Sequence, residues 1–160
     1  MKIQHEHVVS IPRSKVLEIY ADQDFYIGQL KNGGALTVEI LETGTLPGGG
    51  VTRKTKVTQP TKVPPMLRTS DTDQFVDNMK VDVAAAKMSY QITPAQFAAQ
   101  FYLAGAIDFV DLGSSTRMIF STEVEVKIPF IGKKFEKQAI DEAEELVRKQ
   151  VEFLKNWAAR

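Results

Sequence analysis

The clearest pattern in the chain is a two-residue alternation of apolar and polar positions over residues 116–128. Charged and polar side chains fill one face, and the other carries Met118, Phe120, Thr122, Val124, Val126 and Ile128. Such alternation predicts a strand of an antiparallel sheet with one buried face and one wet face. Two further segments, residues 84–92 and 100–112, repeat this period. Their predicted inward residues are Ala86, Met88, Tyr90, Ile92, Phe101, Leu103, Gly105, Ile107 and Phe109.

Three more strands are predicted upstream of these. Residues 3–11 alternate weakly and end before Pro12, and residues 35–42 and 50–59 form a hairpin whose glycine-rich tip covers residues 45–50. The segment from 66 to 83 is the least regular, with a strand expected around residues 75–81. The sequence therefore predicts six or seven strands.

Helical spacing appears in three places. A short helix follows Pro12, with Ser10 as its candidate cap, and a second short helix from residue 22 to 30 has Asp22 or Asp24 as its candidate cap. Residues 133–158 form one long amphipathic helix. Its predicted buried stripe consists of Ile140, Ala143, Val147, Val151, Leu154 and Ala158.

This order of elements predicts an α+β fold in one domain spanning residues 1–160. A curved antiparallel sheet of six to seven strands wraps around the C-terminal helix, with two short helices after the first strand. A helix of about 25 residues spans roughly 37 Å and does not fill such a sheet, so large side chains or a cavity must occupy the remainder. The predicted lining of that space is Met88, Tyr90, Phe101, Leu103, Ile107, Met118, Phe120, Thr122, Ile140, Ala143, Val147 and Arg53.

Composition narrows the class of protein. The 20 basic residues balance the 20 acidic ones, which disfavours a nucleic-acid-binding protein because such proteins normally carry a basic excess. There is no cysteine, so disulfides, thiol nucleophiles and cysteine-based metal sites are excluded. The polar first seven residues do not resemble a secretory signal, and no apolar run is long enough to span a membrane. We therefore expect a cytoplasmic protein without integral membrane association.

Three segments carry a resemblance to a known superfamily: residues 9–17, 21–26 and 124–136. Together with Gly105 and the turn at residues 113–117, they resemble the START-like, or helix-grip, superfamily, which includes the Bet v 1-like proteins. The third segment is similar to the strand-to-helix junction of an uncharacterised-domain family within it. The superfamily includes lipid-transfer domains, plant pathogenesis-related proteins, polyketide cyclases and coenzyme Q-binding proteins. The resemblance implies a helix-grip fold. It does not by itself identify a function, because one fold hosts many functions.

Few residues offer chemistry beyond the expected cavity. His5 and His7 share a strand face with Ile3 and Val9, but no local carboxylate joins them as a third metal ligand, so no metal or other cofactor is expected. The acidic residues Asp71, Asp73 and Asp77 do not match a calcium loop and are expected in a solvated loop. The glycine run at residues 48–50 lacks the phosphate-loop pattern and indicates a turn.

These observations favour a protein that binds a small hydrophobic molecule, such as a lipid, an isoprenoid or a polyketide-like compound. Tyr90, Thr122 and Arg53 are the expected polar anchors, and the two short helices and residues 60–66 are expected to gate the opening. Two alternatives stay open. The first is a cyclase- or lyase-type enzyme with His7, Tyr90 or an aspartate as proton carrier, and the second is a co-chaperone-like module that binds a protein partner.

Overall fold

In the part of the chain that the structure describes, seven strands form one antiparallel sheet in the order β1-β7-β6-β5-β4-β3-β2. The computed structural model describes residues 1–63 and 65–160; residue 64, in the segment expected to gate the opening, lies outside the described residues. The strands are β1 (Lys2–Val9), β2 (Thr37–Leu46), β3 (Gly50–Pro60), β4 (Thr72–Asp82), β5 (Lys87–Pro94), β6 (Phe101–Asp111) and β7 (Thr116–Val126).

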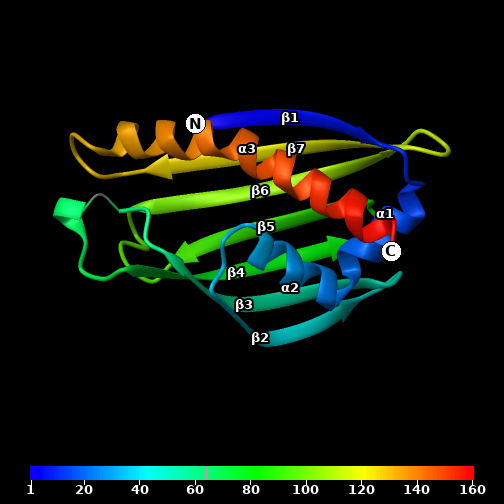
Figure 1. Cartoon of the computed structure of the whole chain (residues 1–160), viewed down its shortest axis with the longest axis horizontal. Coiled ribbons are helices and arrows are strands. Elements are labelled where there is room, and N and C mark those ends of the chain that lie inside the picture. Colours follow the sequence, from blue (N-terminus) through cyan, green and yellow to red (C-terminus); the bar gives the residue numbers. More distant parts are fainter. Residues whose placement is uncertain (64) are drawn as a thin grey trace.

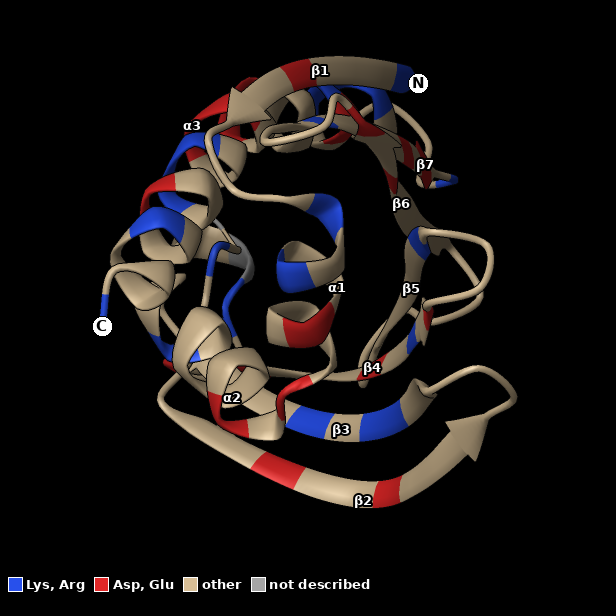
Figure 2. Ribbon diagram, turned by 90° about the vertical axis from the view of Figure 1, so that its right-hand side faces the viewer, with Lys and Arg blue, Asp and Glu red and all other residues tan. Residues whose placement is uncertain are grey.

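The helices lie on the concave side of this sheet. They are α1 (Arg13–Ala21), α2 (Gln23–Asn32) and α3 (Gly132–Ala158), with a short 3₁₀ turn, η1, at Pro65–Leu67. Seen end-on, the sheet curls around α1, while α2 and α3 lie between its two edge strands (Figure 2). The predicted α+β, helix-grip architecture is confirmed, including the two short helices after the first strand.

The alternation read from the sequence sets which face of each strand is buried. Register places Met88 opposite Ile107 and Ile107 opposite Phe120, so these side chains form one inward row across β5, β6 and β7. Along β7, Thr116, Met118, Phe120, Val124 and Val126 are all buried. The described helices lie unevenly over this face (Figure 1). The helix α3 runs along β7 and β1, whereas α1 approaches β4 and β6.

Several predicted boundaries were wrong, and local turn chemistry explains them. Ala86 was expected within a strand, but it lies in the β4–β5 turn at φ 51°, where its amide donates to the carbonyl of Val83. The strand β2 continues to Leu46, because the hairpin tip needs only the glycines that follow Pro47. The last strand ends at Val126 and does not reach Ile128.

The helix caps also differ in part from expectation. Pro12 itself precedes the first residue of α1, and no side chain caps that helix, so Ser10 was wrong as a cap. The carboxylate of Asp22 accepts hydrogen bonds from the amides of Asp24 and Phe25, which makes Asp22 the cap of α2. The segment from 66 to 83 contains a full-length strand, since β4 begins at Thr72 and pairs with β3 throughout.

Candidate functional site

One half of the concave face, here called the packed half, is filled by side chains. Tyr20 of α1 packs against Phe25 and Phe109 with ring centroids 5.1 and 5.2 Å apart. Every member of this group exposes 4% of its surface or less, so it leaves no room for a ligand. The packed half consists of Val9, Val16, Tyr20, Phe25, Phe109, Met118, Val151 and Leu154.

The other half, here called the open half, contains inward-facing apolar side chains that stay half-buried. Its members are Ile92, Phe101, Leu103, Ile140 and Ala143. None of these five packs against the main core among the described residues. Ile92 lies opposite Leu103 on the sheet, and Ile140 and Ala143 belong to the stripe of α3 that faces inward. An apolar face that water still reaches is a candidate surface for an apolar ligand.

A cluster of buried polar side chains lies between the two halves. The hydroxyl of Tyr26 on α2 donates to Oδ2 of Asp77 at 2.8 Å, and Thr55 lies directly opposite Asp77 in the β3–β4 register. Asp77 and Thr55 expose 5% and 0% of their surfaces. Because Asp77 also lies opposite Ile92, the cluster borders the open half.

Arg53 joins this cluster from the same strand as Thr55. Its Nη2 donates to the carbonyl oxygen of Ala21, the last residue of α1, and its guanidinium lies 5.4 Å from the centre of the Tyr26 ring. Burial lowers the pKa of Arg53, while the Tyr26 hydroxyl and the Asp22 carboxylate oppose that effect. Arg53 is therefore on the predicted inward face, and one of its nitrogens is committed to holding the α1–α2 junction.

Three polar atoms of this cluster lack a hydrogen-bond partner among the described residues: Nη1 of Arg53, Oγ1 of Thr55 and Oδ1 of Asp77. An unpaired buried polar atom is costly, so each calls for a water molecule or a ligand group as its partner. Burial raises the pKa of Asp77 to about 6, although the hydrogen bond from Tyr26 acts in the opposite direction. Burial and the Asp77 charge both raise the pKa of Tyr26, which keeps its phenol protonated as a donor.

Tyr90 and Thr122 form a second polar point on the same face. Tyr90 lies opposite Gly105, which in turn lies opposite Thr122, so the tyrosine ring can cross the glycine toward the threonine. A Cβ at position 105 would fall 2.4 Å from the ring and hydroxyl of Tyr90, which explains why glycine is needed there. Burial raises the pKa of Tyr90, and the Thr122 hydroxyl acts in the opposite direction.

The loops at the open end are joined to one another and to α3. The amide of Lys127 donates to the carbonyl of Gln100, and Nε2 of Gln96 donates to Oγ1 of Thr69. Across the mouth, Nζ of Lys62 lies 2.9 Å from Oε2 of Glu142 on α3. This ion pair ties the β3–β4 connection to the helix, at the segment that the sequence predicted as a gate.

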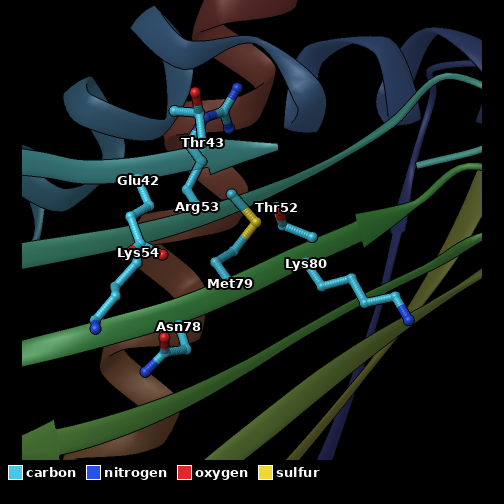
Figure 3. A pocket seen from close by; sticks show the side chains of 8 residues that line it. All are labelled: Glu42, Thr43, Thr52, Arg53, Lys54, Asn78, Met79 and Lys80. Carbon is cyan, nitrogen blue, oxygen red and sulfur yellow. The ribbon is translucent and has the colours of Figure 1, made fainter. Parts of the chain in front are cut away.

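Two hollows formed by the described residues lie away from the open half. The first has a volume of about 360 Å³ at strands β2 to β4, and its lining, drawn in Figure 3, is mostly polar or charged: Glu42, Thr43, Thr52, Arg53, Lys54, Asn78, Met79 and Lys80. The second, of about 210 Å³, lies between α1 and the end of α3. The first hollow shares only Arg53 with the lining expected from the sequence, and the second shares none of those residues.

The predicted lining residues divide between the two halves. Phe101, Leu103, Ile140 and Ala143 belong to the open half, and Met88, Tyr90 and Thr122 are half-buried beside it. In contrast, Ile107, Met118, Phe120 and Val147 are buried members of the main core. The structure therefore brings the predicted residues onto one face, but only some of them are accessible to a bound molecule.

Three members of the polar cluster were not predicted from the sequence as site residues: Tyr26, Thr55 and Asp77. Asp77 was expected in a solvated loop, and this was wrong, because it occupies an inward position of β4 and is buried. The signal was present in its spacing, since Phe75, Asp77, Met79 and Val81 alternate along one strand face. A carboxylate within such a row indicates a buried polar site.

The histidines of β1 share a strand face with Ile3 and Val9, as predicted, and that face points inward. His7 meets Phe120 edge-on, with ring centroids 6.0 Å apart, and Nε2 of His5 is buried without a hydrogen-bond partner among the described residues. Within residues 1–63 and 65–160, no group of three or more His, Asp or Glu side chains comes together as a metal site would require. In the same residues, none of the helices is long and apolar enough to cross a bilayer.

Comparison with known families agrees with this architecture. A family model described as "protein of unknown function (DUF2505)" matches residues 4–158, almost the full length of the chain. The chain belongs to this family. No curated protein matches the sequence. The predicted resemblance to an uncharacterised-domain family is thereby confirmed.

Solved structures share the fold at low sequence identity. Norcoclaurine synthase from Thalictrum flavum, in complex with dopamine and hydroxybenzaldehyde, has a TM-score of 0.70 at 19% identity, covering 100% of this chain and 87% of that one. A START superfamily protein from Mycobacterium smegmatis gives 0.65 at 17% identity and 98% coverage of both chains. The Zhui aromatase/cyclase from Streptomyces sp. R1128 gives 0.57 at 16%, covering 97% and 86%. These likenesses establish the START-like fold.

Proposed function

We propose that this protein binds a small apolar molecule, such as a lipid, an isoprenoid or a polyketide-like compound, against the open half of its concave face. The observation that carries the proposal is the half-buried, inward-facing set of Ile92, Phe101, Leu103, Ile140 and Ala143, none of which packs against the main core among the described residues. Burial of each such side chain by a ligand would contribute favourably in proportion to the apolar area covered.

The polar cluster gives the ligand an orientation. A hydroxyl or carbonyl group placed beside Asp77 would meet an unpaired donor on Arg53 and unpaired oxygens on Thr55 and Asp77. Ligand sites commonly combine an apolar wall with a few such polar groups. The similar structures support this proposal, because one of them, norcoclaurine synthase, is seen in complex with small aromatic molecules.

A pair of tryptophan substitutions on β6 tests the binding surface. Leu103 faces the open half and its neighbour Tyr102 is exposed on the outer face. With the uncharged fluorescent probe N-phenyl-1-naphthylamine, we expect saturable binding to the native protein and to Tyr102→Trp. We expect Leu103→Trp, which fills the open half, to bind about tenfold more weakly. Equal affinities for the two variants, or no saturable binding to native protein, would contradict the proposal.

A second candidate function is proton transfer in the same site, as in a cyclase or lyase. The observation in its favour is the Tyr26–Asp77 hydrogen bond at 2.8 Å, with the Asp77 pKa at about 6. A carboxylate with this pKa can accept a proton from carbon near neutral pH and return it. The general base would be Asp77, and Tyr26 would hold it in place.

Deuterium exchange tests this second function without knowledge of the natural substrate. The bicyclic ketone 2-tetralone exchanges its α-hydrogens for deuterium when a base removes and returns a proton, and nuclear magnetic resonance follows the exchange. We expect native protein to accelerate exchange with a rate that rises as the pH passes about 6. Asp77→Asn should abolish the acceleration, while Asp108→Asn, at a half-exposed ion pair on β6, should retain it. Failure of native protein to accelerate exchange argues for binding alone.

A further inference from the structure

Three large hydrophobic side chains project into water at the open end of the molecule. Met66 lies in η1, Phe97 in the β5–β6 loop and Phe130 in the β7–α3 loop. They expose 89%, 61% and 105% of their surfaces. Neither the core nor the open half uses these side chains, so their exposure calls for a partner outside the chain.

The three loops form one continuous rim. Hydrogen bonds from Lys127 to Gln100 and from Gln96 to Thr69 join each loop to the next. All three lie together at the left end in Figure 1, away from α1 and the C-terminus. The projecting side chains therefore point from a shared end of the molecule, which is also the end where the open half begins.

The backbone holds two of these side chains in an uncommon conformation. Phe97 and Phe130 have φ angles of 60° and 69°, in the left-handed region that is unfavourable for residues with a Cβ. Glycine would fit both positions better, and neither aromatic ring is buried in exchange. Because burial of the rings does not offset this backbone strain, we infer that the aromatic side chains themselves have a role at these positions.

Positive charge surrounds Phe130. Residues 127–137 contain four lysines and a single acidic residue, Glu136, which is buried and lies 4.0 Å from the N-terminal amine. Lys133 and Lys134 are exposed at the start of α3. Lys127 lies 3.7 Å from Glu125, and Lys133 lies 3.5 Å from the buried Glu136. Among the described residues, the lysines of this segment without a carboxylate partner are therefore Lys134 and Lys137, both of which follow Phe130.

We propose that this rim docks on the surface of a lipid bilayer that carries anionic lipids. Aromatic and methionine side chains on separate protruding tips can enter the interfacial layer without a matching pocket, whereas a protein partner would need one for each tip. Lysines beside the tips would lie at the level of the anionic head groups. Docking would place the entrance of the open half against the bilayer, which is a source of apolar ligands. This role of docking rests on the proposed function.

Vesicle sedimentation tests the docking with matched variants of the whole chain. The probes are vesicles of phosphatidylcholine alone and of phosphatidylcholine with one quarter phosphatidylglycerol. We expect native protein to bind the anionic vesicles, and Phe130→Ser and Phe97→Ser each to weaken binding about tenfold. The control is Leu112→Ser, because Leu112 is also exposed, at 44%, but lies in the β6–β7 turn at the opposite end. It should bind like native protein.

The docking proposal is also tested by removing lysine charges at the rim and by measuring whether the protein dimerises. The double variant Lys133→Gln, Lys134→Gln should lose affinity for anionic vesicles and most of the salt dependence, while Lys155→Gln near the end of α3 should not. Binding of N-phenyl-1-naphthylamine in solution should be unchanged in all rim variants, so a failure of docking is distinguishable from a failure of ligand binding. Three results would overturn the proposal: no binding of native protein to vesicles, equal loss in Leu112→Ser, or a dimer in sedimentation velocity that the rim variants abolish.

Discussion

The packed and open halves are built from the same strands, yet they differ in what covers them. Strands β6 and β7 each have 11 residues, or about 36 Å of length. The helix α1 has nine residues and reaches about 13 Å, so it can fill only one end of the curled sheet. Where α1 is present, Phe109 and Met118 are buried, and beyond it Phe101 and Leu103 on β6 stay half-buried.

This difference shows that the length of one short helix decides where the interior is available. The packed half supplies most of the folding free energy, because its side chains are almost fully removed from water. The open half contributes less to stability and is free to serve binding. The buried polar cluster of Tyr26, Arg53, Thr55 and Asp77 lies at the boundary. Three of its atoms have no hydrogen-bond partner among the described residues, which lowers the stability of the fold and leaves these atoms available to a ligand.

The largest expected effect compares the same substitution in the two halves. Leu154→Ala in the packed half removes a fully buried side chain and should lower the free energy of unfolding by about 2–5 kcal/mol. Leu103→Ala in the open half should lower it by less than about 1 kcal/mol, because water already reaches that side chain. Urea denaturation monitored by circular dichroism measures both. Equal losses would mean that the open half is packed as tightly as the packed half.

Gly105 offers the next test, at the border of the open half. In Gly105→Ala the added methyl group would meet the Tyr90 ring and hydroxyl at 2.4 Å, and displacement of the ring should cost about 1–3 kcal/mol of stability. If this clash is the cause, Gly105→Ala should be nearly neutral when combined with Tyr90→Ala. A double-mutant cycle by urea denaturation measures the coupling. Additive effects of the two substitutions would rule out the contact.

The inward faces of β5, β6 and β7 could be predicted from the sequence because alternation with a period of two leaves one choice of face. Met88, Ile107 and Phe120 are therefore where the pattern placed them. Alternation does not report how much of that face a helix covers. For this reason Met118 and Leu103 looked equivalent in the sequence, although one is buried in the core and the other is half-buried.

The polar cluster could not be predicted because it depends on contacts between distant segments. Tyr26 and Asp77 are 51 positions apart, and only the packing of α2 over β4 brings them together. A strand was predicted around residues 75–81, within β4, but Asp77 was grouped with Asp71 and Asp73 as part of a solvated loop. The carboxylate that interrupts the apolar row of this strand is the residue that marks the candidate site.

Asp77 should show a stability gain when its charge is removed. The pKa rise from 3.8 to about 6 corresponds to at most about 3 kcal/mol, and the weaker hydrogen bond from Tyr26 to an amide leaves an expected gain of about 1–2 kcal/mol for Asp77→Asn at pH 7.5. The same variant should bind a hydroxyl- or carbonyl-bearing ligand less well. Stability gained together with function lost is typical of a site residue.

The pH dependence of this gain has a definite sign. The native protein holds the Asp77 proton more tightly than the unfolded chain does, so the Asp77 contribution to stability falls as the pH rises between about 4 and about 6. Native protein and Asp77→Asn should therefore have similar stability near pH 3.5, and they should differ fully above pH 7. Thermal unfolding across this range measures the difference. A gap that does not change with pH would contradict burial of a titrating carboxyl.

The smallest effect on stability is expected at the ion pair that crosses the mouth of the open half. Lys62 and Glu142 are both largely exposed, and Lys62→Gln should therefore change the free energy of unfolding by less than about 1 kcal/mol. Its effect should appear in kinetics, because loss of the link between the β3–β4 connection and α3 leaves the entrance less restrained. Stopped-flow mixing with N-phenyl-1-naphthylamine should show faster association, and 1 M salt should produce the same change in native protein by screening the pair. Lys155→Gln, which removes a similar ion pair beside the packed half, should leave the rate unchanged, and an equal acceleration in that control would show that the pair does not restrict entry.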